Sequence, residues 1–410
     1  METPSAHPNL ETLISTLPTP GNWVNLKGLI SCASKYLSTQ EDASEPSLEC
    51  TSISLLGSGT HNYVYRLCFS SGLQLAASIP KTDEEAFFPA GRLSEIATMK
   101  FVAESGLYPD IPVPKIHAWE VGFNNEAGAP WTLMELVHGA HVDSEHAEGG
   151  GVGVTGFDLY PEDMQMAIVK ALARLQGHLS KPMPFDKIGS IYLRENDQKK
   201  GSTTTAGFEI GPLTQFGQRI HHDSLGGPYT SPAHMYTTLL QGHMSHALRN
   251  WCSLHTDSIC DPDSPFPLGL TPRTFSDIFH MLTSLIPQFT LPQSTSALVL
   301  HHPDIALRNI FFDEASLKEG TPRITGVIDW SGAQILPLML TAIFPGDLMS
   351  STRTPFQPSF FRRNSRPEST IWSTVPFDWT STGNPTNWPW SWVHPQISVR
   401  PLPCRYRDSI

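Results

Sequence analysis

Two stretches of the sequence carry residues whose types and spacing could do chemistry. Residues 300–312 read LHHPDIALRNIFF, in which apolar runs flank a polar loop with the spacing H-x-D-x-x-x-x-N. The loop holds His302, Asp304 and Asn309, and Asp329 follows twenty residues after Asn309, at the end of the apolar run ITGVI. Phosphoryl transfer uses such a set: one carboxylate orients and deprotonates the attacking hydroxyl, and an amide oxygen and a second carboxylate hold Mg²⁺ on the nucleotide phosphates. The spacing therefore indicates phosphoryl transfer.

Taken one at a time, these residues have ordinary explanations. An aspartate in a loop is usually a turn former or a helix cap, and an aspartate at the end of a strand is often only solvated. The order and spacing of the whole set, placed after a β-rich segment, is what favours a kinase-like fold.

The elements that must position this set are predicted from the hydrophobic period. Five strands are expected in the first third of the chain, over residues 53–56, 63–69, 73–79, 116–121 and 131–137. The first three are separated by tight turns, which predicts an antiparallel meander. Helices are expected at residues 24–37, 94–106 and 164–179, the second with Ser94 as its N-cap, and two hairpins are expected within 297–333.

Composition excludes several classes of protein. The chain has 410 residues, a formal net charge of −12 and 16% charged residues, so it lacks the basic balance of a general nucleic-acid binder. The longest apolar run, residues 335–344, is too short to span a membrane. Six cysteines are too sparse for a disulfide scaffold, and no secretory signal or presequence is visible, so a cytoplasmic location is expected.

The last sixty residues differ from the rest. From Ser351 onward there are nine prolines, and five of the ten tryptophans lie between Trp372 and Trp392, with no helical or strand period. Such a segment is expected to be disordered. The predicted organisation is an N-terminal extension, a β-rich lobe, a helical lobe and this tail, over residues 1–49, 50–137, 138–347 and 348–410.

Seven stretches resemble one family. HHPDIALRNIFFD, ITGVIDWSGAQILPLML, SEIATMKFV, IPVPKIHAWE, GAPWTLMELVHG, IGSIYLREND and FEIGPL cover roughly residues 50–347. They resemble the aminoglycoside phosphotransferase family, relatives of choline kinase and protein kinases, and in particular a fungal branch that includes the altered-inheritance-of-mitochondria proteins. The resemblance implies an α+β, two-lobed, protein kinase-like fold with a β-rich N-lobe and a mainly helical, truncated C-lobe. A mitochondrial location also becomes an expectation of the resemblance.

The resemblance implies roles for the residues quoted. Asp304 is the expected catalytic base, and Asn309 and Asp329 are the expected Mg²⁺ ligands. Glu95 matches the helix glutamate that pairs with a phosphate-binding cation, although an acid in the first turn of a helix is also favoured by the macrodipole. The remaining expected ATP contacts are the turn glycines Gly57 and Gly59 and the hinge residues Met134, Glu135 and Val137.

Those ATP contacts have plainer alternatives. The turn at residues 57–60 lacks the full G-x-G-x-x-G and by itself reads as a plain hairpin turn. The stretch LMELV at residues 133–137 also reads as an ordinary buried strand.

Two features depart from the family pattern. The third strand of the family normally carries Arg or Lys in a run like A-A-R-I-P, where this chain has Ser78. Lys81 lies three residues further on, but strand alternation directs it to the opposite face, unless the chain bends. After Pro345 the expected helices of the acceptor site are replaced by the atypical tail.

The sequence offers little support for two other possibilities, a zinc site and a serine hydrolase. His243, His246, Cys252, His255 and Cys260 have a spacing that matches no closed zinc motif, and their surroundings favour an amphipathic helix. The chain has no G-x-S-x-G.

Two hypotheses for function remain. In the first, the protein is an ATP- and Mg²⁺-dependent enzyme that phosphorylates a hydroxyl of a small molecule. In the second, it is a degenerate, pseudokinase-like nucleotide-binding or scaffold protein. Ser78 supports the second hypothesis, and the intact Asp304, Asn309 and Asp329 support the first.

Overall fold

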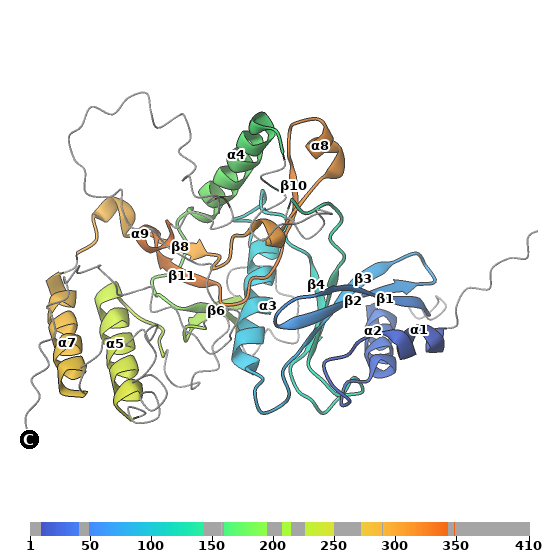
Figure 1. The fold of residues 1–410 in the computed structure, drawn as a ribbon, viewed down its shortest axis with the longest axis horizontal. Coiled ribbons are helices and arrows are strands. Elements are labelled where there is room, and N and C mark those ends of the chain that lie inside the picture. Colours follow the sequence, from blue (N-terminus) through green and yellow to red (C-terminus); the bar gives the residue numbers. More distant parts are fainter. Residues whose placement is uncertain are drawn as a thin grey trace, which may run out of the picture. The chain divides into compact units, whose positions relative to one another are not determined.

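The computed structural model describes residues 10–40, 49–142, 157, 160–194, 207–214, 226–249, 272–288, 290–342 and 348 (Figure 1). The chain divides into two compact units, Met1–Pro355 and Phe356–Ile410, and every described residue belongs to the first. Of the predicted tail, Leu348 is described and is buried in a hydrophobic cluster, and the rest lies outside the described residues. The predicted domain boundaries remain predictions. The chain shows the predicted α+β class.

An antiparallel sheet forms the N-terminal part. Its five strands are ordered β1-β2-β3-β5-β4. They are β1 (Cys50–Ser58), β2 (Asn62–Phe69), β3 (Gln74–Pro80), β4 (Ile116–Glu120) and β5 (Trp131–Glu135). The predicted meander is confirmed, but the first turn is shorter than expected, because Gly57 still pairs with Val64 and Ser58 with Tyr63.

The two faces of this sheet pack against different partners. Leu75, Ala77 and Ile79 of β3 belong to a hydrophobic cluster that also contains residues of α2 (Leu26–Gln40). Side chains of the short α1 (Leu10–Thr16) pack on the same cluster. Since successive strand residues point to opposite faces, Ser78 points to the other face. Met134 of β5 packs from that other face onto a second cluster.

Helix α3 (Pro89–Glu104) corrects the predicted helix start. It begins five residues before Ser94, with Pro89 in its first turn, where a fixed φ and a missing N–H cost nothing. Ser94 is 1% exposed inside the helix and is not the N-cap. Glu95 therefore lies beyond the first turn, so the macrodipole no longer accounts for it.

Five further α-helices lie in the rest of the described chain. They are α4 (Glu162–Leu179), α5 (Pro232–Arg249), α7 (Pro272–Leu285), α8 (Glu314–Lys318) and α9 (Leu338–Thr341). The predicted helix at 164–179 is confirmed by α4. A small hairpin joins β6 (Ser190–Leu193) to β7 (Phe208–Gly211).

Four short strands frame the loops that carry the predicted catalytic set. They are β8 (Leu298–His301), β9 (Ile310–Phe312), β10 (Ile324–Val327) and β11 (Gln334–Pro337). Of the two hairpins predicted within 297–333, one is confirmed, since β9 pairs with β10. The other is wrong, because β8 pairs with β11 around that hairpin. The pairing is nested, so the loops leaving β8 and β10 start from neighbouring points of one frame.

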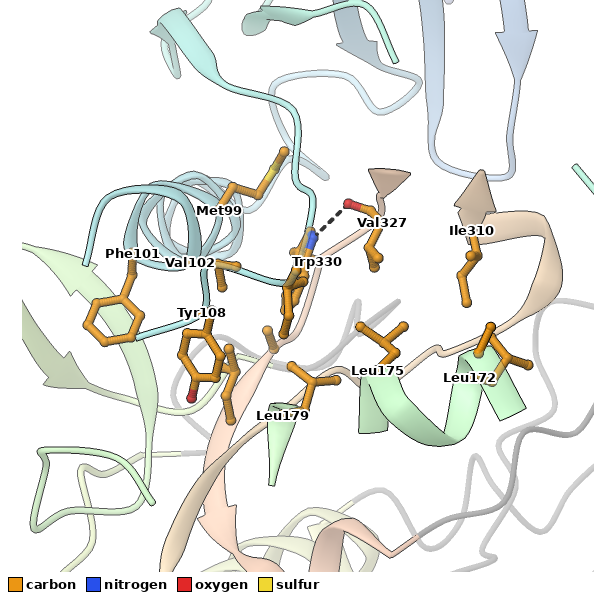
Figure 2. Packing of buried hydrophobic residues seen from close by; sticks show 14 of the residues in the cluster. Met99, Phe101, Val102, Tyr108, Leu172, Leu175, Leu179, Ile310, Val327 and Trp330 are labelled. Atoms are coloured by element: carbon orange, nitrogen blue, oxygen red, sulfur yellow. Dashed lines mark hydrogen bonds between the residues drawn. The ribbon is translucent and has the colours of Figure 1, made fainter. Parts of the chain in front are cut away.

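The main core lies beneath this frame. Trp330 is 0% exposed, and its indole N–H donates to the carbonyl of Val327 at 3.0 Å. Figure 2 shows Trp330 among side chains of α3 and α4 and of the β9–β10 hairpin. The residue that follows Asp329 is thus anchored in the largest hydrophobic cluster, and Asp329 is placed by that anchor. Among the described residues, no helix is long and apolar enough to cross a membrane.

Shortening Leu179 should cost the protein stability. Leu179 is 0% exposed, and Leu→Ala at such sites removes about 2–5 kcal/mol of unfolding free energy, because a cavity remains. Urea denaturation of Leu179→Ala measures the loss. Leu285→Ala is the control, since Leu285 is 50% exposed and should change stability by less than about 1 kcal/mol. Equal losses in the two variants would contradict the packing described.

Candidate active site

The loop between β8 and β9 fixes Asp304 and Asn309 to each other. A 3₁₀ turn, Leu307–Asn309, follows the loop. The side-chain amide of Asn309 donates to the backbone carbonyl of Asp304 and to its Oδ2, both at 3.0 Å. Both bonds use Nδ2, so the Oδ1 oxygen of Asn309 faces away from them and is available as a ligand for a hard cation.

The guanidinium of Arg308 also binds the Asp304 carboxylate. Arg308, four residues later, donates to Asp304 Oδ1 at 2.7 Å and to Oδ2 at 2.6 Å. A guanidinium contacting both oxygens orients a carboxylate. The Arg308 side chain is 52% exposed and that of Asp304 23%, so the Asp304 carboxylate can be reached from solvent.

His302 connects this loop to the one that carries Asp329. Its Nε2 lies 3.1 Å from the carbonyl of Ile328, and its Nδ1 accepts from the backbone N–H of Asp304 at 3.2 Å. A carbonyl only accepts, so Nε2 carries the proton and the ring is neutral. Burial lowers the pKa of His302 to about 4, which keeps this neutral form at physiological pH.

Asp329 lies one residue beyond the last cross-strand bond of the frame. The N–H of Ile328 donates to the carbonyl of Asn309 at 3.0 Å, which brings the two predicted metal ligands to adjacent strand ends. Asp329 has φ 62, the one described non-glycine residue with a positive φ. Asp and Asn tolerate this left-handed region better than other non-glycine residues. Backbone strain of this kind often occurs at functional positions.

The surroundings of Asp329 disfavour the charged form of its carboxyl group. Burial, and then the charges of Glu95 and Asp304, raise the pKa of Asp329 to about 7, while Arg308 and Arg92 act in the opposite direction. Acidic oxygens thus gather in a place with too little positive charge to neutralise them. Carboxylate and amide oxygens are the donors that Mg²⁺ prefers, so Asn309 and Asp329 are the residues that would hold such a cation.

Glu95 is paired with a cation from its own helix. Arg92 Nη1 lies 3.2 Å from Glu95 Oε2, and the side chains are 8% and 14% exposed. The other end of the guanidinium donates to Asn62 Oδ1, at the start of β2 directly after the glycine turn. Arg92 therefore joins α3 to the turn that carries Gly57 and Gly59.

The two candidates for the third-strand position lie apart. Ser78 is 3% exposed on the sheet face that is turned away from α2. Lys81 Nζ is 2.9 Å from Ser58 Oγ and 4.6 Å from the centre of the Tyr63 ring. Tyr63 packs on the cluster of the opposite face, so Lys81 does not take the place of a cation at Ser78.

The predicted hinge packs against the β9–β10 hairpin. Glu135 ends β5 and exchanges hydrogen bonds with Lys115, while a Cβ on Gly326 would lie 2.3 Å from Val137. His138 accepts from Thr325, and Ala140 pairs with Phe312 through two backbone bonds. The structure therefore holds the linker along the hairpin whose ends present Asn309 and Asp329.

The predicted residues are brought together in part. Asp304 and Asn309 are in direct contact, and Asp329 interacts electrostatically with Asp304 and Glu95. Gly57 and Gly59 meet this group only through Asn62 and Arg92. Of Met134, Glu135 and Val137, none has a described hydrogen bond or ion pair with the acidic group.

Sequence reasoning missed two arginines of this site. Arg92 stands three residues before Glu95, and Arg308 stands four residues after Asp304. The spacing of Arg92 and Glu95 places opposite charges on one face of α3, and this was the available signal for Arg92. Asp304 lies in a loop, so the same argument gives no signal for Arg308.

The possible zinc cluster is not supported by the described residues. His243 and His246 lie on α5, while Cys252, His255 and Cys260 are outside the described part of the chain. Burial, and then the charge of His246, lower the pKa of His243. Within the described ranges, no three His, Cys, Asp or Glu side chains are grouped so that they could hold a metal ion.

Comparison with known proteins assigns the family. Residues 52–340 match the model of the phosphotransferase enzyme family, APH. This is more than half of the chain, so the chain belongs to that family, and its fold is of the protein kinase-like class.

Relatives with names are distant and longer. A subtelomeric hrmA-associated cluster protein of Aspergillus fumigatus is 26% identical over 72% of this chain and 60% of its own length. The altered inheritance of mitochondria protein 9, mitochondrial, of Candida dubliniensis is 24% identical over 71% of this chain and 48% of the relative. The chain thus spans about half to two thirds of these relatives.

Solved structures resemble the chain loosely. A putative aminoglycoside phosphotransferase from Ralstonia eutropha is 15% identical, covering 78% of this chain and 68% of its own, with a TM-score of 0.38. A Plasmodium vivax ethanolamine kinase is 15% identical over 81% and 69%, with a TM-score of 0.37. At these TM-scores the likenesses carry no further argument.

The raised pKa of Asp329 predicts a pH effect in the metal-free protein. A carboxyl whose pKa is about 7 in the folded state and 3.8 otherwise stabilises the fold when protonated, and this stability is lost as pH rises from about 4 to about 7. Asp329→Asn does not titrate and tolerates the same φ. The unfolding free energy of the wild type minus that of the variant should therefore fall by roughly 2–4 kcal/mol between pH 4 and pH 8.

Urea unfolding in EDTA at a series of pH values measures this difference. The buried His301 and His302 titrate in both proteins, so their effects cancel in the subtraction. A difference that stays constant with pH would show that the Asp329 carboxyl ionises normally.

Proposed function

We propose that this protein transfers the γ-phosphate of ATP to a hydroxyl of a small molecule. Asp304 orients the acceptor, and its carboxylate takes the hydroxyl proton. The freed oxygen then attacks the γ-phosphorus, the bond from that phosphorus to the bridging oxygen breaks, and ADP leaves with the bonding electrons. Bound Mg²⁺ would neutralise charge on the phosphates.

The observation that carries this proposal is the joint placement of Asp304 and Asn309. One amide bonds both to the backbone and to the carboxylate of Asp304 through Oδ2, and among the described residues the Oδ1 oxygen is contacted by Arg308. A base held in one orientation, beside an amide oxygen free to bind a cation, is what in-line phosphoryl transfer requires. Family membership supports the same reaction class.

The frame around these residues supports positioning rather than flexibility. His302 ties the Asp304 loop to the Asp329 loop, and the β9–β10 pairing continues into the Asn309–Ile328 bond. A site whose reacting groups are locked by such bonds does not have to reorganise during the reaction. The hinge near Met134, Glu135 and Val137 is proposed to hold the adenine.

The acceptor is proposed only as a class. Family relatives act on hydroxyl groups of antibiotics, choline, sugars and amino acids, and these compounds define the first screen. The cytoplasmic location expected from the sequence is carried as a proposal, beside the mitochondrial one suggested by the name of the Candida relative.

One observation favours the second candidate, a nucleotide-binding protein without phosphotransferase activity. Ser78 is buried where the family carries a cation, and a hydroxyl cannot neutralise phosphate charge. This candidate predicts that phosphate never leaves ATP, whichever acceptor is supplied.

Asp304→Asn tests the proposed base. It should lower turnover about 10²- to 10⁴-fold, because an amide cannot accept the proton, and leave MgATP affinity within about threefold. ADP formation with the best acceptor of the screen measures turnover, and calorimetry measures affinity. Asp110→Asn is the matched control, since the Asp110 side chain is 58% exposed, and it should leave both quantities unchanged. Full turnover by Asp304→Asn would remove Asp304 from the role of base.

Asp329→Asn tests the metal site. In the wild type, ATP affinity should increase at least tenfold when Mg²⁺ is added, because the cation links the phosphates to Asn309 and Asp329. In Asp329→Asn the increase should shrink to about threefold or less. Calorimetric titrations of ATP with Mg²⁺ and with EDTA give both ratios, and equal Mg²⁺ responses in the two proteins would exclude Asp329 as a ligand.

A further inference from the structure

Arg92 is a cation in an unusual place. Arg92 is the most buried lysine or arginine among the described residues, with 9% of its surface exposed. Arginine is rarely this buried unless its charge is fully paired or binds a ligand.

The contacts of Arg92 join the parts of the protein that would surround a nucleotide phosphate. Through Nη1 it meets Glu95 on α3, and through Nη2 it meets Asn62 beside the glycine turn. Because Asn62 follows the glycine turn directly, a phosphate bound at that turn would lie next to this guanidinium.

Arg92 also faces the side of the sheet on which a third-strand cation would emerge. Asn62 pairs with Pro80 and Val64 pairs with Ser78, so Asn62 and Ser78 point to the same face. Arg92 reaches that face from α3, opposite the strand. The cation and Ser78 thus approach one space from two sides.

The guanidinium has donors to spare. Its five N–H groups make two described hydrogen bonds, one to Glu95 and one to Asn62. The planar fork of arginine matches the geometry of phosphate oxygens. A purely structural ion pair at i,i+3 needs no contact with the glycine turn, whereas a phosphate ligand does.

We propose that Arg92 binds the phosphates of the nucleotide and replaces the cation that is missing at Ser78. The proposal rests on the proposed function, since it takes ATP to be the ligand of this site. Glu95 then keeps the role of orienting a phosphate-binding cation, but that cation comes from its own helix. In this case the positive charge has moved from position 78 to Arg92, and Ser78 is no sign of a lost activity.

The test compares ligands with and without phosphates. Calorimetry measures the affinity of Arg92→Gln for MgATP and for adenosine. MgATP should bind about 10- to 100-fold more weakly, because a charge-assisted pair of hydrogen bonds is lost, while adenosine binds within about twofold of the wild type. A residue that only supports the fold would affect both ligands alike.

Two further variants make the result specific. Arg323→Gln removes an arginine that is also paired with a carboxylate, Asp313, but is 73% exposed, and it should leave MgATP affinity unchanged. Arg92→Gln combined with Ser78→Arg returns a cation to the third strand and should recover at least tenfold of the lost affinity. If Arg92→Gln does not fold, Arg92→Gln/Glu95→Gln is measured in its place, because it leaves no unpaired buried carboxylate.

The outcomes separate this inference from the proposed function. A wild type that does not bind MgATP overturns the proposed function and leaves the inference without its ligand. A wild type that binds, together with a folded Arg92 variant of equal MgATP affinity, overturns the inference alone. Parallel loss of MgATP and adenosine, or an equal loss in Arg323→Gln, also overturns it.

Discussion

Mutual repulsion among the carboxylates of Glu95, Asp304 and Asp329 is the constraint around which the site is arranged. Taking such groups out of water together is costly, and two of the three are paired with an arginine. Arg92 contacts Glu95, and Arg308 contacts both oxygens of Asp304. Burial and the charges of Glu95 and Asp304 raise the pKa of Asp329 to about 7, so positive charge from outside the chain has most to stabilise at that residue.

Burial explains why the histidines next to these acids remain neutral. Burial lowers the pKa of His301 and His302 to about 4, so neither supplies a charge at physiological pH. His302 acts through its two nitrogens, one toward the carbonyl of Ile328 and one toward the N–H of Asp304. A protonated ring would present a donor to that N–H and would break the link between the two loops.

Much of this could be predicted from the sequence, because it depends on local patterns. Strands β1 to β5 and helix α4 follow from period and turn residues, and the spacing of Asp304, Asn309 and Asp329 identified the candidate site. The nested pairing of β8 with β11 could not be predicted, since alternation shows that a strand exists but does not choose its partner. The predicted start of α3 is wrong because the apolar stripe begins near Ser94, whereas the helix already begins at Pro89. Arg92 was missed because a phosphate-binding cation was sought only on a strand.

The pairing of Arg92 with Glu95 has a consequence for regulation. When a cation on a strand pairs with a glutamate on a helix, the bond forms only if the helix lies close to the sheet, so the pair reports the position of the helix. Here both partners lie one turn apart on α3, and the pair remains formed wherever that helix moves. The bond that crosses from the helix to the sheet is the one between Arg92 and Asn62. The contact of Arg92 that depends on the position of α3 relative to the sheet is thus the hydrogen bond to Asn62 and not the ion pair.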